Sequence, residues 1–147
     1  MLNLAILASS SMGQPLQWKD GKIFHVLFTI TPTNVNTGAN ANPYIAGGDT
    51  LDLTQLVSLA GGAPGASLPT FEAVALVTIQ SARGKLATGY AGLYEYSYAP
   101  STALNNGTMQ IFTGAAAQSP LTELAAGNYP ANVLNDVIIG HAYFVMP

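Results

Sequence analysis

The stretch GYAGLYEYSYAP, residues 89–100, contains four tyrosines at even-numbered positions: Tyr90, Tyr94, Tyr96 and Tyr98. A strand sends every second side chain to the same face, whereas a helix repeats after about 3.6 residues. The spacing therefore predicts a β-strand with its tyrosine rings on one side. Such a ladder serves either to pack and cover a sheet or to present a face to a ligand or partner.

A second strand is predicted directly after the tyrosine stretch. Residues 108–114 read TMQIFTG, and the intervening residues 100–107 contain Pro, Ser and Asn-Asn-Gly without regular periodicity. Asn106-Gly107 can adopt the positive φ that a return turn needs. The two runs are therefore expected to form a β-hairpin with a long tip.

Strand patterns recur along the rest of the chain. Leu2, Leu4 and Ile6 alternate with other residues and predict a first strand or a docking arm. Residues 22–31, KIFHVLFTIT, are apolar on both faces, which favours a central strand covered on both sides. Residues 50–53, 71–81 and 137–145 predict further strands, with Gly140 as a bulge or close-packing point. Residues 122–127 are compatible with one helical turn.

These patterns predict an all-β protein. The expected fold is a single antiparallel β-sandwich or barrel, jelly-roll-like, of about seven or eight short strands with long loops. Residues 1–147 form one domain in this interpretation, because 147 residues suffice for one core, and residues 1–12 form an N-terminal arm. The Asn-rich residues 33–43 are expected to be a loop that contacts a partner or is solvated.

Charged side chains are scarce. Only 7% of the residues are Asp, Glu, Lys or Arg, against about 25% in an ordinary soluble domain. Sparse charge favours association, so much of the surface is expected to lie against other protein chains. Four Lys and Arg residues are too few for a nucleic-acid surface. The apolar runs are also too short for a membrane-spanning helix.

No catalytic or metal-binding motif emerges from the sequence. The chain has no Cys and two histidines, His25 and His141, each within an apolar strand. They could ligate a metal together with Asp136 or Glu95, but histidines hydrogen-bonded within a sheet are the favoured interpretation. Acidic residues beside the glycines near residue 49 are expected to cap turns rather than bind calcium. We therefore expect no enzyme activity, no cofactor and no metal.

Four segments carry a resemblance to a known group of proteins. They are GGDTLDL (47–53), GYAGLYEY (89–96), MQIFTG (109–114) and ELAAGNYPANVLNDVIIGHAYFV (123–145). In this order they resemble small virion structural proteins of tailed bacteriophages, particularly head decoration (cement) proteins. The resemblance implies a non-enzymatic protein on the capsid surface of the virion, present in the host cytoplasm during assembly. It also implies two partners, the major capsid protein and the chain itself, commonly as a homotrimer.

The expected contact elements are the N-terminal arm, the Asn-rich loop and the aromatic strand. Their predicted interface residues are Leu2, Leu4, Ile6, Asn34, Asn36, Asn40, Asn42, Tyr90, Tyr94, Tyr96 and Tyr98. An alternative is a phage head or tail appendage or adhesin module that binds glycan through exposed tyrosines. A third alternative is a fibre subunit that polymerises by itself.

Overall fold

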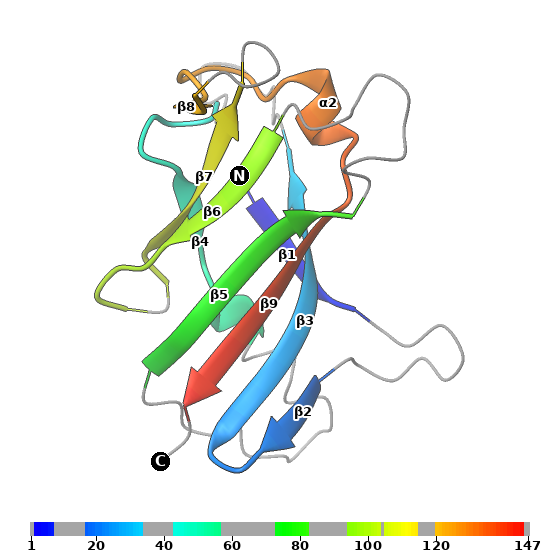
Figure 1. Cartoon of the computed structure of the whole chain (residues 1–147), viewed down its shortest axis with the longest axis vertical. Coiled ribbons are helices and arrows are strands. Elements are labelled where there is room, and N and C mark those ends of the chain that lie inside the picture. The colour runs from blue at the N-terminus through cyan, green and yellow to red at the C-terminus, as the bar shows by residue number, and fades with distance from the viewer. Residues whose placement is uncertain are drawn as a thin grey trace.

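The computed structural model describes residues 2–7, 17–33, 43–56, 73–82, 94–103, 105–114 and 120–145. Within these ranges nine strands form two antiparallel sheets, which confirms the predicted all-β class (Figure 1). The five-stranded sheet contains β1 (Leu2–Ile6), β2 (Gln17–Asp20), β3 (Ile23–Pro32), β5 (Ala73–Ser81) and β9 (Ile138–Val145). The four-stranded sheet contains β4 (Asp49–Leu51), β6 (Tyr94–Ala99), β7 (Gly107–Thr113) and β8 (Thr122–Glu123).

Strand β3 is central in the five-stranded sheet, as its apolar composition predicted. β1 and β2 pair with different halves of one edge of β3, and β9 pairs with the other edge. β5 then pairs with β9, with a register shift between Val74 and Leu76. In the four-stranded sheet, β7 lies between β6 on one side and both β4 and β8 on the other.

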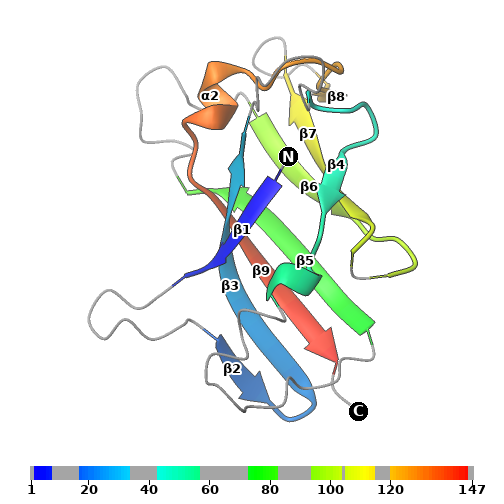
Figure 2. The ribbon, with the colours of Figure 1, turned by 180° about the vertical axis from the view of Figure 1, so that it is seen from behind.

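The two sheets face each other and approach at both edges. β5 lies beside β6, and β1 contacts β4 (Figures 1 and 2). The strand pairing in the described part of the chain does not link the sheets into a closed barrel, so the architecture is that of a sandwich. Its core is filled by large, fully buried side chains: Tyr44, Phe28, Phe144, Ile30, Leu51, Leu53, Leu56, Met109, Ile111, Ile138, Val26 and Val133. Burial of one such side chain contributes about 1.5–3 kcal/mol.

One local pattern differs from the structure. The sequence of residues 122–127 is compatible with a helical turn, but Thr122 and Glu123 form β8, which pairs with Thr113 and Phe112 of β7. Pairing with a free strand edge outweighs the weak helical preference of so short a segment. The helix α2 (Ala131–Leu134) begins instead after Pro130, a residue that suits the start of a helix because its φ is already helical.

The hairpin of β6 and β7 is confirmed, but its tip differs from the predicted turn. Gly107 is not among the glycines with positive φ, and it is the first residue of β7. Its role is steric, because a Cβ at this position would lie 2.3 Å from the hydroxyl oxygen of Tyr98. The loop is held by Asn106, whose side-chain oxygen accepts a hydrogen bond of 2.9 Å from the backbone N–H of Ala103.

Gly140 is a close-packing point rather than a bulge. It pairs with Phe28 of β3 in an uninterrupted register, and the irregularity in this sheet lies in β5 instead. A Cβ on Gly140 would lie 2.2 Å from Cζ of Phe28. The absence of a side chain at Gly140 therefore makes room for the fully buried aromatic ring of Phe28.

The Gly140→Ala substitution is expected to destabilise the fold by about 1–3 kcal/mol, because the added methyl overlaps the Phe28 ring in a packed core. Urea unfolding followed by circular dichroism measures the change. The double variant Phe28→Leu/Gly140→Ala should lose less free energy of unfolding than the two single variants lose in sum. Strictly additive effects would contradict the proposed steric contact.

Candidate functional site

The N-terminal strand uses its apolar side chains inside the chain. Leu2 and Leu4 are 4% and 8% exposed, and Ile6 packs against the same core. β1 pairs with β3 along its whole length, so residues 2–6 are part of the sandwich. This corrects the prediction that Leu2 and Leu4 contact a partner through their side chains. The period-two pattern that suggested a contact strip is the pattern of a strand with one face buried.

The tyrosine ladder also faces inward. Tyr96 is 8% exposed, and Tyr94 and Tyr98 are half-buried against the core. The packing interpretation of the ladder is therefore correct for these three rings, and the interface interpretation is wrong for the buried Tyr96. Tyr90 and the predicted contact residues Asn34, Asn36, Asn40 and Asn42 lie outside the described residues.

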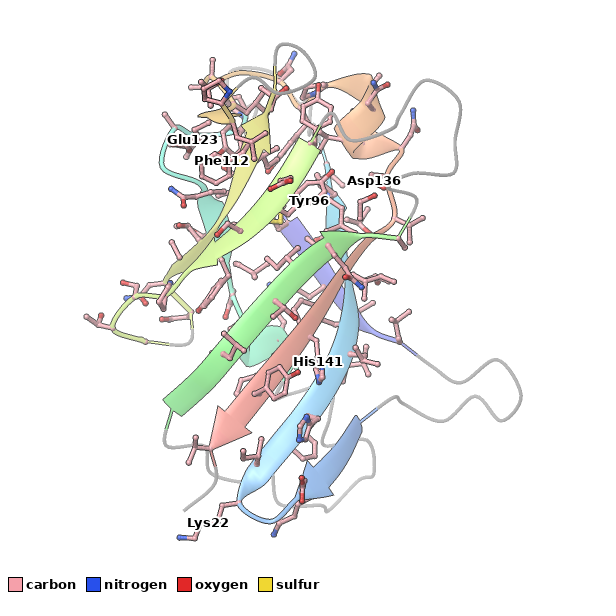
Figure 3. The ribbon with its side chains drawn as sticks, viewed as in Figure 1. Lys22, Tyr96, Phe112, Glu123, Asp136 and His141 are labelled. Atoms are coloured by element: carbon pink, nitrogen blue, oxygen red, sulfur yellow. The ribbon has the colours of Figure 1, made fainter. Side chains whose placement is uncertain are left out.

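Tyr96 connects the two sheets through a hydrogen bond to Asp136. The Tyr96 hydroxyl donates to Oδ2 of Asp136 at 2.8 Å, and the Ser81 hydroxyl donates to Oδ1 at 2.7 Å. Tyr96 belongs to the four-stranded sheet, Ser81 ends β5 of the five-stranded sheet, and Asp136 precedes β9. Figure 3 shows Tyr96 and Asp136 side by side. One half-buried carboxylate thus ties three segments together.

A second tyrosine–carboxylate cluster lies at the four-stranded sheet. The Tyr44 hydroxyl donates to Oε1 of Glu123 at 2.8 Å and accepts from the backbone N–H of Ile111 at 3.1 Å. Tyr129 donates to Oδ2 of Asp49, whose carboxylate is buried with 5% exposure. The Tyr44 and Tyr129 rings meet edge to face, with centroids 5.9 Å apart. The cluster fastens the segment before β4 to β7 and β8.

Sequence reasoning missed these pairs, although one signal was present. Asp49 has the same parity as Leu51 on β4, so its side chain points into the core. A carboxylate there needs hydrogen-bond donors, because an unpaired buried charge is costly. The identity of the donor, Tyr129, depends on a contact between residues 80 positions apart and could not be inferred from local patterns.

Burial and the neighbouring carboxylates raise the pKa of the tyrosines. Burial, followed by the Asp136 carboxylate, raises the pKa of Tyr96 well above its usual value, and burial beside Asp49 does the same for Tyr129. Burial, with a further contribution from Glu123, raises the pKa of Tyr44 to about 12. Burial alone raises the pKa of Tyr98. These four hydroxyls therefore remain protonated where exposed tyrosines ionise.

The Tyr96→Phe substitution is expected to destabilise the fold by about 1–3 kcal/mol, because Asp136 loses a donor in a largely desolvated site. The matched control is Tyr94→Phe, which removes the same atom from the same face of the same strand and should cost less than about 0.5 kcal/mol. Denaturant unfolding measures both. Equal losses would show that the hydrogen bond between the sheets has no particular role.

Alkaline pH is expected to destabilise the fold. An unfolded tyrosine releases its proton near pH 10, whereas Tyr44, Tyr96, Tyr98 and Tyr129 retain theirs when folded. The stability due to this difference is complete below about pH 10 and is lost as pH rises toward the folded pKa values. Tyrosinate absorbance should therefore rise for these residues together with loss of the circular dichroism signal. Reversible ionisation of all seven tyrosines near pH 10 in folded protein would contradict this.

The outer face of the five-stranded sheet carries no charged side chain on the three strands β3, β9 and β5, and the exposed Asp20 of β2 borders it opposite Ile23. We define this outer face as Ile23, His25, Leu27, Thr29, Ile139, His141, Tyr143, Val145, Leu76, Thr78 and Gln80, which share one side by register. Leu76 is 54% exposed and Ile23 is 38% exposed. The face is therefore an apolar and neutral polar surface that remains partly accessible.

The two histidines meet on this outer face. His25 Nδ1 and His141 Nε2 are 3.4 Å apart, and Tyr143 packs against both rings. The sequence left open a metal bound by these histidines with Asp136 or Glu95. This alternative is wrong, because Asp136 accepts a hydrogen bond from Tyr96 and Glu95 lies on the four-stranded sheet. Burial, followed by the charge of His25, lowers the pKa of His141. This keeps its imidazole neutral at pH 7.

The described residues contain no group of three or more His, Cys, Asp or Glu side chains arranged to hold a metal. They also contain no helix long and apolar enough to span a membrane. Comparisons of the chain with protein-family models, curated proteins and solved structures found no match. Among the described residues, the outer face and the histidine pair on it are the features that suggest a function.

Proposed function

We propose that this chain is a virion structural protein, a decoration or cement protein that binds the outside of a phage head and stabilises it across capsomer boundaries. The observation that carries the proposal is the charge-free outer face of β3, β9 and β5, with Leu76 and Ile23 exposed on it. Residues at the centre of protein interfaces are depleted in charge, and these three strands present no charged side chain on this face.

Internal use of the acidic residues strengthens the argument. Three of the seven acids, Asp49, Glu123 and Asp136, accept hydrogen bonds from tyrosine hydroxyls within the fold. The whole sequence contains only four further acids and four basic residues. A surface with so little charge is suited to permanent contact with other proteins rather than to a freely diffusing monomer.

The proposed partners are the major capsid protein and further copies of this chain, commonly as a trimer, as the resemblance implies. The glycan-binding alternative depended on exposed tyrosines. Tyr44, Tyr96 and Tyr129 are buried, and Tyr94 and Tyr98 pack against the core, so the described part of the tyrosine ladder does not favour it.

The proposal is tested by mixing the purified chain with purified phage heads and measuring the bound protein after sedimentation. Binding is expected to saturate at a fixed number of copies per head, and bound heads should resist heat or low salt better than bare heads. Light scattering on the chain alone gives its oligomeric state. A monomer that binds no head, or a chain that binds arrayed glycans instead, would overturn the proposal.

A pair of variants tests which face makes the contact. Leu76→Lys puts a charge on the outer face at an exposed position, where no core packing is lost, and should weaken head binding by about tenfold or more. Ser97→Lys adds the same charge at an exposed position on β6 of the other sheet and should leave binding unchanged. Equal affinity of the two variants would exclude the outer face as the contact surface.

A further inference from the structure

We infer that His25 and His141 form a zinc-binding site on the outer face of the five-stranded sheet. The histidines come from neighbouring strands and are offset diagonally, since His25 pairs with Tyr143 and His141 pairs with Leu27. This register brings two imidazole nitrogens, the commonest protein ligands for transition metals, to within 3.4 Å of each other. The site uses neither of the carboxylates considered from the sequence.

The separation of the two nitrogens suits a tetrahedral ion. Zinc binds imidazole nitrogen at about 2.05 Å, so two nitrogens at a tetrahedral angle lie about 3.3 Å apart. A right angle, as in octahedral or square-planar complexes, would require about 2.9 Å. The observed 3.4 Å between His25 Nδ1 and His141 Nε2 is close to the tetrahedral separation.

The surroundings hold both rings in position for an ion. Nε2 of His25 is buried, and Nδ1 is the nitrogen that faces His141. Tyr143 packs against both rings on the same face, with ring centroids 4.9 Å from His25 and 4.1 Å from His141. Both imidazoles are half-buried and thus reachable from solvent. Rings held in place lose little side-chain entropy when they coordinate an ion.

Binding needs a lone pair on each of the two facing nitrogens. Without an ion, one of the facing nitrogens is able to donate a hydrogen bond to the other, according to the tautomer. When zinc binds, the donating ring moves its proton to its far nitrogen, so that both rings direct a lone pair at the metal. The two histidines supply two ligands, and water completes the tetrahedron. The affinity is therefore lower than that of a structural zinc site with four protein ligands.

Calorimetric titration of the untagged protein with zinc chloride at pH 7 tests the site. We expect one ion per chain, and magnesium chloride, a hard ion that prefers oxygen ligands, should give no heat of binding. His25→Gln and His141→Gln should each weaken zinc binding by at least about tenfold, since a chelate needs both nitrogens. Thr78→Gln is the matched control, because it places the same side chain next to His141 on the same face and keeps both histidines.

The chain has only these two histidines and no cysteine, so no other His or Cys side chain can supply a zinc ligand when one histidine is replaced. Loss of affinity in both single variants supports the chelate. Unchanged affinity in either single variant would overturn it, because the ion would then rest on one imidazole or on carboxylates. If a variant fails to fold, NMR spectroscopy of the native protein tests the zinc site instead. Zinc should shift Nδ1 of His25 and Nε2 of His141 together, and a shift of only one nitrogen would contradict the site.

Discussion

Hydrogen bonds from buried tyrosines to carboxylates hold the segments of this sandwich together. Tyr96 reaches from the four-stranded sheet to Asp136, which also accepts from Ser81 of the five-stranded sheet. Tyr129 and Tyr44 reach Asp49 and Glu123 in the same way. Each contact satisfies a carboxylate that would be costly to bury alone, and each joins residues at least 40 positions apart in the chain. The two sheets share no ladder in the described residues, so the Tyr96–Asp136 contact and the apolar core between the sheets connect them.

This use of acidic residues has a consequence for the surface. The chain is already poor in charge, and three of its seven acids are engaged with tyrosines inside the fold. What remains outside in the described residues is a surface with few charges, among them the exposed Lys19, Asp20 and Glu95. The outer face of β3, β9 and β5 is its clearest part, because it carries no Asp, Glu, Lys or Arg. An assembly role explains why such a face is kept free of charge.

The histidine pair lies within the same outer face but depends on a different physical property. Its geometry follows from the register of two strands, which places two imidazoles diagonally, and from the ring of Tyr143 that packs on both. Assembly through the outer face requires only that the face be apolar and neutral. A metal site requires in addition that two nitrogens converge, so the two proposals stand independently.

The sequence by itself determined the fold class, the central position of β3 and the hairpin of β6 and β7, and it limited Gly140 to a bulge or a close-packing point. These follow from period-two alternation, apolar composition on both faces and the special position of glycine, all of which are local properties. It did not determine which side of β6 faces the core, or that β1 is embedded in the sandwich. The tyrosine ladder looked the same for either choice, because alternation defines two faces without saying which one is covered. Only the tertiary structure decided this, by packing β1 and one side of β6 against the core and bringing Asp136 to Tyr96. The free energy of such contacts arises between residues distant in the chain, so no local pattern contains it.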